Sequence, residues 1–416
     1  MYSSLAFNKW KRRAKKKFVP HVVMMLIAAG LVVLHVVFLA QNAQVVVAQG
    51  VYPQGNQFPL GLYSIHLAEE MSVARQSGWN IVHRYKFTPS FLKTSAKSKM
   101  FALASLPGKS EPIAEGFAAQ TISNLAKSDQ VVWWDFPEER RYWEEGEMAL
   151  VTTYAAWTRK YDPKKRPNYM YIPGHYSAED VQKYVPYLDV IPASIYTTYV
   201  NMPHAWVRWR METTLKGIHL ARAKIGSDFL HGEKTPLAIL ELFHEDGKSI
   251  MTAQGAYHDF WQAIVSGAKG IFIFSYWHKR DHPALEAVWQ MYNKAAKQIT
   301  GPEKLGSAIL YGKELRNVRF EISTGPKKTN EFKFYDMTKP VSFSSIDLLA
   351  KVWNNNIYVF AVNSAQQPVS VRLTGLPSKA KQATILFENK IVPVTDGALN
   401  TNFALLGVHI FKIASS

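Results

Sequence analysis

Short apolar runs alternate with longer amphipathic stretches through the middle of the chain. Eight of these runs are rich in β-branched or aromatic residues and are continuous rather than alternating in polarity; they lie at 59–66, 80–87, 99–108, 130–136, 168–175, 188–196, 237–244 and 270–277. Strands with continuous apolar sequences are buried on both faces, as they are in parallel sheets. The pattern therefore predicts a parallel sheet as the core of this segment.

Amphipathic stretches with a helical period separate most of these runs. They follow the first strand and then the third to the eighth, at 68–77, 112–126, 140–160, 178–185, 204–225, 253–266 and 284–298. Eight βα units match a (β/α)8 TIM barrel in number and size. A doubly wound open sheet is the main alternative, but no glycine-rich phosphate loop follows the first strand. We predict an α/β fold with a TIM barrel over 57–301.

The pattern changes after Gly301 and Pro302. The sequence LLAKVWNNNIYVFAVNSAQQPVSVRLTGLP contains three strand-like runs separated by polar turns, and two similar runs follow it. Turn signals near ten-residue spacing are typical of small β-sandwiches. We therefore predict a small all-β sandwich domain over 302–416.

The N-terminal region has the layout of a membrane segment. Residues 22–40 are almost entirely apolar, and the preceding residues 1–21 carry seven Lys and Arg and no acid. This length is close to that needed to cross a bilayer, and the positive-inside rule keeps the basic segment cytoplasmic. We predict a single-pass transmembrane anchor at the cell membrane, a linker over 41–56, and an extracytoplasmic globular part. Small residues at 46–48 leave open a cleaved signal and a secreted or periplasmic protein.

The charge and the cysteine count narrow the function. The formal net charge is +17, and seven of the positive charges belong to the N-terminal segment. The remaining positive charge weakly favours binding to acidic glycans or anionic surfaces. No nucleic-acid-binding motif is present. The absence of cysteine excludes disulfides, Cys-ligated zinc and a thiol nucleophile. For an exported protein it suits a bacterial envelope.

Carboxylates follow two strands whose ends meet at the mouth of a barrel. The fourth strand ends with Asp135, Glu138 and Glu139, and the seventh contains Glu241 near its end. TIM-barrel active sites lie at these strand ends. Glycoside hydrolysis requires two carboxyl groups, one to protonate the leaving oxygen and one to attack the sugar or activate water. Simpler interpretations remain open: a salt bridge between Glu241 and Arg84, a turn cap at Asp135, and a solvated helix face for the paired glutamates.

The layout resembles the clan of retaining glycoside hydrolases with (β/α)8 barrels, which includes β-galactosidases and cellulases with a C-terminal β-domain. The resemblance rests on the sequence Trp-Asp-Phe-Pro-Glu-Glu at 134–139 and on the strand ends near Glu241 and Trp277. It implies that Glu241 is the nucleophile, Glu139 the acid/base and Trp277 a sugar-stacking aromatic. Glu138 stands where the clan often has an Asn that binds the sugar 2-hydroxyl. Asp135 and Glu138 stay alternatives for the acid/base.

Further residues at the strand ends are candidates for sugar contact, because apolar sugar faces pack on aromatic rings and polar side chains bind hydroxyls. Besides Trp277, they are Tyr276, His66, Arg84, His175, Tyr196, His244 and Trp134. The leading hypothesis is an exported protein that acts on a polysaccharide or oligosaccharide without a cofactor.

Two other classes of function compete with this hypothesis. One is a non-catalytic glycan-binding or envelope scaffold protein that has the barrel but not the chemistry. The other is a metal-dependent hydrolase or deacetylase using His278, Asp281 and His282, whose H-x-x-x-H spacing places both imidazoles on one helix face. Lys279 and Arg280 would repel a cation there, and no H-E-x-x-H or G-x-S-x-G motif occurs. We therefore expect no metal.

Overall fold

The computed structural model describes residues 50–108, 113–225, 233–335 and 337–414. All of them belong to one compact unit. None of the helices in the described part has the length and apolar character that a membrane crossing needs. The run at 22–40 and the small residues at 46–48 lie outside the described residues, so the anchor and the signal stay predictions.

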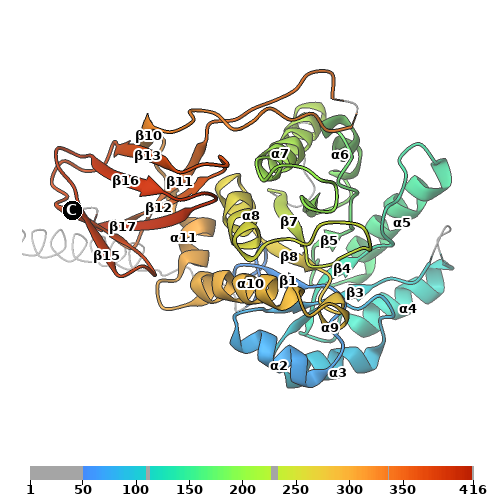
Figure 1. Cartoon of the computed structure of the whole chain (residues 1–416). Coiled ribbons are helices and arrows are strands. Elements are labelled where there is room, and N and C mark those ends of the chain that lie inside the picture. Colours follow the sequence, from blue (N-terminus) through green and yellow to red (C-terminus); the bar gives the residue numbers. More distant parts are fainter. Residues whose placement is uncertain (1–49, 109–112, 226–232, 336, 415–416) are drawn as a thin grey trace, which may run out of the picture. The chain divides into compact units, whose positions relative to one another are not determined.

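Eight parallel strands close into a barrel, and each predicted run overlaps one of them (Figure 1). The strands are β1 (Leu60–Leu62), β2 (Ile81–Val82), β3 (Phe101–Ser105), β4 (Val131–Asp135), β5 (Asn168–Tyr169), β6 (Val190–Ile195), β7 (Thr235–Glu241) and β8 (Ile271–Phe274). Each strand pairs with the next, and β8 pairs with β1. The predicted TIM barrel is confirmed.

Helices follow every strand of the barrel. They are α2 (Ala68–Gln76), α3 (Pro89–Lys97), α4 (Glu115–Leu125), α5 (Glu145–Tyr161), α6 (Ala178–Tyr184), α7 (Trp206–Ile225), α8 (Ala253–Val265), α9 (His278–Asp281) and α10 (Leu285–Thr300). The helix α3 was not predicted from the pattern. It has nine residues, of which Phe91, Leu92 and Ser95 are buried. Thr88 at the N-cap and Pro89 in the first turn are the start signals that the sequence offers.

Large side chains fill the barrel interior. Leu103, Trp133, Ile239 and Phe272 pack there, and the Trp133 and Phe272 rings stack with centroids 5.6 Å apart. Gly61 on β1 makes room for this stack, because a Cβ at that position would lie 2.3 Å from the Phe272 ring. The interior is thus a packed core that leaves space for ligand only above the strand ends.

The residues after α10 form the second domain. The short helix α11 (Leu305–Tyr311) leads into two antiparallel sheets that share one apolar core. One sheet has the order β10 (Arg319–Thr324), β13 (Val369–Thr374), β16 (Leu399–Phe403); the other has the order β15 (Lys390–Pro393), β14 (Gln382–Ile385), β17 (Val408–Ala414), β12 (Asn356–Asn363), β11 (Ile346–Trp353), β9 (Lys313–Glu314). The predicted β-sandwich is confirmed.

The sandwich packs on α8 and also sends a long segment to the barrel. The rings of Trp261 on α8 and Phe360 on β12 stack with centroids 5.8 Å apart. Between β10 and β11 the chain leaves the sandwich and runs to the region of α7, as the orange segment at the top of Figure 1 shows. Phe334 on this segment contacts Trp206 at the start of α7, with centroids 5.0 Å apart. The second domain therefore contributes side chains to the barrel mouth.

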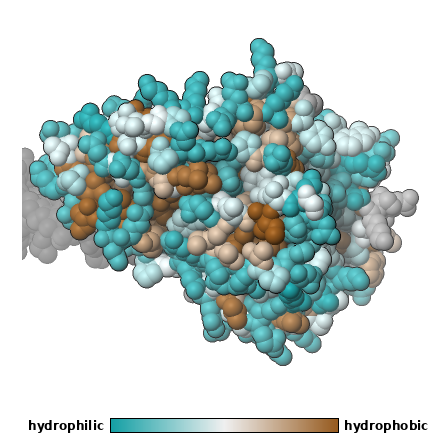
Figure 2. All heavy atoms as spheres, viewed as in Figure 1, coloured by the Kyte–Doolittle hydropathy of each residue, from teal (hydrophilic) through white to brown (hydrophobic). Residues whose placement is uncertain are grey.

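The face of the molecule seen in Figure 2 is mainly hydrophilic, and its apolar side chains are interspersed with polar ones. Most apolar residues of the described part lie in the two cores.

Candidate active site

A cavity of about 430 Å³ opens at the carboxyl ends of the barrel strands. We call it the central cavity. Three carboxylates line it, Glu138, Glu139 and Glu245, and most of its other walls are aromatic: Tyr85, Tyr171, His175, Tyr196, Tyr199, Trp206, Phe243, Phe274, His278, Phe334 and Tyr335. The alternation of strand side chains explains this wall. Tyr171 and Phe274 lie two residues beyond Tyr169 and Phe272, which fill the barrel interior.

Glu138 is the carboxyl group with the most unusual environment in this cavity. Burial raises the pKa of Glu138 to about 8, and the negative charges of Asp135 and Glu139 add to the shift, while Tyr85 and Arg140 offset part of it. Its Oε1 atom is buried without a hydrogen-bond partner. Glu138 is therefore protonated at neutral pH and has a proton to give, as a general acid requires.

Glu139 is held beside it by an unusual backbone conformation. Its φ angle is +56°, in the left-handed region that costs a non-glycine residue about 1–2 kcal/mol. Its amide donates a hydrogen bond to the carbonyl of Tyr171 at 3.2 Å, which ties this conformation to the end of β5. The strained turn places two neighbouring carboxyl groups on one cavity wall.

Asp135 lies deeper, at the end of β4. It is 3% exposed, its Oδ2 accepts a hydrogen bond from Ser105 Oγ at 2.6 Å, and His83 Nε2 lies 3.3 Å from the same atom. The His83 ring packs against Tyr63, whose hydroxyl hydrogen-bonds to that of Tyr169. Asp135 does not line the central cavity. It belongs to a buried polar layer beneath it and acts on Glu138 through its charge.

Glu241 ends β7 in register with Phe274, but its carboxylate is engaged elsewhere. Its two oxygens accept hydrogen bonds from the amides of Thr198 and Tyr199 at 2.9 and 3.1 Å, and the residue is 2% exposed. Burial raises the pKa of Glu241 to about 7, and the hydrogen bonds from Thr198 and Tyr199 offset part of the shift. Glu241 does not line the central cavity, and in the described structure no ion pair joins it to Arg84.

The other sequence-predicted residues fall into three groups. His175 and Tyr196 line the central cavity, and the His175 ring stacks on Tyr335 with centroids 5.8 Å apart. His66, Arg84 and Trp277 line a second cavity of about 420 Å³, which we call the basic cavity; its remaining walls are Ser64, Tyr85, Lys86 and Arg280. Because Tyr85 lines both cavities, the two adjoin.

Tyr276, His244 and Trp134 line neither of them. Tyr276 is 5% exposed and packs on Trp289, and His244 lies against His282.

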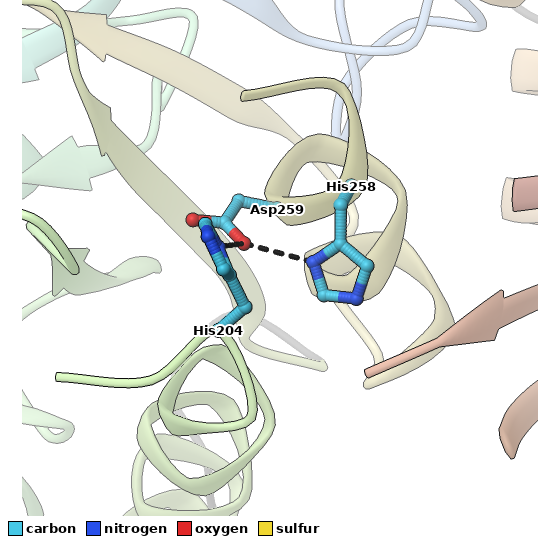
Figure 3. A group of neighbouring side chains, drawn as sticks. All are labelled: His204, His258 and Asp259. Carbon is cyan, nitrogen blue, oxygen red and sulfur yellow. Dashed lines mark hydrogen bonds and ion pairs between the residues drawn. The ribbon is translucent and has the colours of Figure 1, made fainter. Parts of the chain in front are cut away.

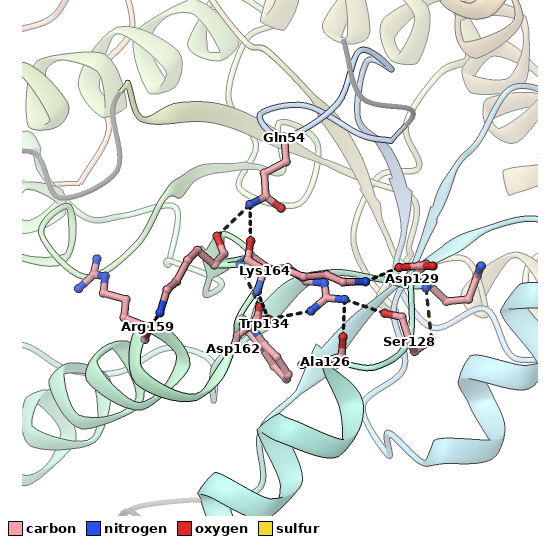
Figure 4. Close-up of polar contacts among 11 residues, drawn as sticks. Gln54, Ala126, Ser128, Asp129, Trp134, Arg159, Asp162 and Lys164 are labelled. Atoms are coloured by element: carbon pink, nitrogen blue, oxygen red, sulfur yellow. Dashed lines mark hydrogen bonds and ion pairs between the residues drawn. The ribbon is translucent and has the colours of Figure 1, made fainter. Parts of the chain in front are cut away.

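Trp134 points into a polar cluster outside the strands (Figure 4). Its Nε1 atom donates to Asp162 Oδ2 at 2.9 Å, and the other oxygen of Asp162 pairs with Arg166 at 3.0 Å. The Arg166 guanidinium also donates to the carbonyls of Ala126 and Ser128. Trp134 therefore fixes β4 against its neighbours, whereas Trp133 faces inward.

Several cavity residues were not predicted from the sequence. Glu245 lies four residues beyond β7 and directly after His244, and Tyr85 and Tyr171 follow β2 and β5, where Arg84 and His175 were the predicted residues. Phe334 and Tyr335 come from the sandwich, and no pattern in the sequence links that segment to the barrel.

The residues predicted for a metal site do not come together, and a different group has the spacing of metal ligands. His278 lines the central cavity, but the His282 ring lies 6.4 Å from it and faces His244. Among the described residues, the group with metal-ligand spacing is His204, His258 and Asp259 (Figure 3).

The carboxylate of Asp259 hydrogen-bonds to both histidines. Asp259 Oδ1 lies 2.7 Å from His204 Nδ1 and 2.9 Å from His258 Nδ1, and Thr197 Oγ1 donates to Oδ2 at 2.8 Å. His258 Nε2 lies 3.0 Å from Ser364 Oγ of the sandwich. Burial alone would raise the pKa of Asp259, but the two histidines hold it at about 2. We interpret the group as a hydrogen-bonded link between the barrel and the sandwich.

No family model matches the sequence, and no curated protein matches it. Solved structures do match. A glycoside hydrolase shares 12% identity at a TM-score of 0.54, over 88% of this chain and 94% of its own. The chain has the fold of glycoside hydrolases.

Two further structures agree. A noncanonic maltogenic α-amylase from Thermotoga neapolitana gives a TM-score of 0.54 at 9% identity, over 86% of this chain and 99% of its own. A glycoside hydrolase family 5 protein from Bacteroides vulgatus gives 0.52 at 13% identity, over 90% and 94%. These shares exceed what the barrel alone would give, so the likeness extends into the β-domain.

Proposed function

We propose that the protein hydrolyses glycosidic bonds within a polysaccharide and that Glu138 is its general acid. The observation that carries this proposal is the raised pKa of Glu138, about 8, in an aromatic-lined cavity that also holds Glu139. Glycoside hydrolysis needs a carboxyl group that is still protonated at the working pH, beside a second carboxylate. The fold shared with glycoside hydrolases is consistent with this chemistry but does not establish it.

In the proposed reaction, Glu138 gives its proton to the glycosidic oxygen as the bond to the anomeric carbon breaks. The leaving sugar departs with a neutral hydroxyl group. In a retaining reaction a second carboxylate bonds to the anomeric carbon, and the ionised Glu138 then takes a proton from the water that displaces it. In an inverting reaction the second carboxylate takes the proton from the attacking water.

The second carboxylate is either Glu139 or Glu245 if the described cavity is the working site, because both line it. That Glu241 is the nucleophile stays a prediction, and it requires the Thr198–Tyr199 amides to release its carboxylate. Retention needs carboxyl groups about 5–5.5 Å apart and inversion about 6.5–9.5 Å. NMR identifies which anomer of the product forms first. This result distinguishes the short carboxyl separation of a retaining site from the longer one of an inverting site.

A polymer fits the site better than a single sugar. The basic cavity adjoins the central cavity at Tyr85. A third cavity, of about 500 Å³, adjoins the central cavity at His175. Three cavities in succession give room for several sugar units on both sides of Glu138.

Activity screening of the purified chain against polysaccharides tests the proposal. We expect Glu138→Gln to lose at least about 100-fold in rate, and to lose less on aryl glycosides whose leaving group needs no proton. Glu139→Ala, Glu241→Ala and Glu245→Ala identify the second carboxylate, since truncation leaves room for azide, which restores turnover only in the variant that lacks it. Glu321→Gln, on an exposed strand of the sandwich, is the matched control.

The second candidate is a glycan-binding protein without catalysis, and the engaged carboxylate of Glu241 is the observation that favours it. If the wild type cleaves nothing while it still binds glycans, and Glu138→Gln binds them equally well, this candidate replaces the first.

We also propose that the globular part is exported and that residues 22–40 anchor it. Protease added to intact cells should then remove a tag placed at the C-terminus. Mass spectrometry of the purified chain distinguishes an anchor, which retains residue 1, from a signal cleaved near 46–48.

A further inference from the structure

The basic cavity carries positive charge without an acid among its described walls. Arg84, Lys86 and Arg280 line it, and Arg280 pairs with Glu70, which lies outside the lining. Within the described part of the chain, no carboxylate pairs with Arg84 or Lys86. Two cations thus face this cavity uncompensated.

Two other polar side chains of the cavity are also able to bind a ligand. Ser64 is 2% exposed, and its Oγ atom is buried without a hydrogen-bond partner. Burial lowers the pKa of His66, and the nearby charges of Arg84 and Arg280 lower it further. His66 is therefore neutral at pH 7, and its ring can donate and accept hydrogen bonds.

An aromatic surface completes the cavity. Trp277 is 39% exposed and lines the basic cavity. The ring of His278 stacks on the Trp277 ring, with centroids 3.9 Å apart. His278 in turn lines the central cavity. A tryptophan face beside unpaired cations suits a ligand that has both an apolar face and a negative charge.

We propose that the basic cavity is a subsite for an acidic sugar residue of the substrate chain, with Arg84 and Lys86 binding its anionic group and Trp277 stacking on its ring. This inference rests on the proposed function, because it assigns the substrate class of the same site. The adjoining wall at Tyr85 places this acidic unit on the same chain as the sugar beside Glu138. The shared chemistry is a carboxylate or sulfate on a sugar ring.

Binding to defined oligosaccharides tests the subsite without requiring turnover. The full chain, purified in mild detergent, is titrated by calorimetry with a galacturonate hexamer, its fully methyl-esterified form, and a sulfated oligosaccharide of equal length. We expect the free acid to bind at least about 10-fold more tightly than the neutral ester, since charged hydrogen bonds contribute more than neutral ones. Comparison of the sulfated oligosaccharide with the galacturonate hexamer shows whether the subsite prefers a sulfate or a carboxylate.

The double substitution Arg84→Gln/Lys86→Gln should abolish this preference and leave binding of the ester unchanged. Lys379→Gln/Lys381→Gln removes the same charge from an exposed turn of the sandwich and should keep it. Trp277→Ala should weaken binding of acid and ester alike.

Equal binding of acid, sulfate and ester by the wild type, or an unaltered preference in the Arg84/Lys86 variant, would overturn the subsite. The proposed function fails separately. Charge-selective binding without any cleavage refutes the hydrolase alone, whereas cleavage of neutral chains without charge preference refutes the subsite alone.

Discussion

Asp135 and Glu138 lie three residues apart at the end of β4; burial raises the pKa of Glu138, and the negative charge of Asp135 adds to the shift. Asp135 is held in the polar layer below the cavity by Ser105 and His83. The two carboxyl groups of this turn therefore have different tasks: Asp135 disfavours ionisation of its neighbour, and the buried Glu138 keeps its proton.

Removing the charge of Asp135 should change the pH profile of the reaction. Without the repulsion, ionised Glu138 is less unfavourable, so its pKa falls. For Asp135→Asn we expect the alkaline limb of kcat/KM, near pH 8 in the wild type, to move down by about 0.5–1 unit. Ser105→Ala removes a hydrogen bond of Asp135 but no charge, and it should leave the limb in place. An unshifted limb in Asp135→Asn would show that Glu138 is not the titrating acid.

Glu138→Gln should make the protein more stable while it abolishes the proposed reaction. The folded pKa, about 8, is above the ordinary value of 4.5, so between these values the folded state binds more protons than the unfolded state. Wild-type stability therefore falls as the pH rises from about 4.5 to 8. At pH 7 we expect Glu138→Gln to gain about 1–3 kcal/mol, and at pH 4 to gain little. Urea unfolding at both pH values measures it; an equal gain at both would refute a raised pKa.

The architecture could be predicted from the sequence because it depends on local periodicity. The eight apolar runs locate the eight strands, and the strand ends near Glu138 and Glu139 locate the mouth. Which carboxylate faces the cavity could not be predicted. Glu241 has the register of an inward residue, and the loop at 198–199 captures its carboxylate through backbone amides that any sequence possesses.

Contacts between the two domains were equally beyond prediction. Tyr335 reaches the barrel because a segment of the sandwich runs to it, and its pairing with His175 joins residues 160 positions apart. Trp133 and Trp134 are adjacent and chemically identical, so composition alone does not tell which one faces inward.

Tyr335 should contribute to binding of long chains rather than to the chemical step. It is 76% exposed, stacks on His175 and lines the central cavity, where it offers a free face to a sugar ring. We expect Tyr335→Ala to weaken binding of a polysaccharide about 5–10-fold, at unchanged kcat, since a stacking contact contributes about 1 kcal/mol.

The matched control for this prediction is Phe387→Ala, which removes an aromatic ring that is 48% exposed in the sandwich. A loss of kcat in Tyr335→Ala, or an equal loss of binding in the control, would contradict the assignment. Calorimetry for binding and initial rates for kcat separate the two effects.

Asp259 should carry a pH-dependent part of the stability, through its link to His204 and His258. The lowered pKa of Asp259, about 2, gives stability that is present above pH 3.8 and is lost as the pH falls through 2. Burial alone would lower the pKa of His204, but Asp259 raises it above 6.5. This second contribution is complete below pH 6.5 and is lost as the pH rises through the folded value.

Asp259→Asn should therefore cost most between pH 4 and 6.5, about 2–4 kcal/mol, and less in alkaline solution, where His204 is neutral in both proteins. Urea unfolding at pH 5 and at pH 9 measures the difference, and Ser364→Ala serves as a control that removes a neutral partner of His258 and should cost less, without the pH dependence. A cost that is independent of pH would contradict a charged His204–Asp259 pair. Zinc that raises the melting temperature of the wild type, but not of Asp259→Asn, would instead show that the three side chains bind a metal ion.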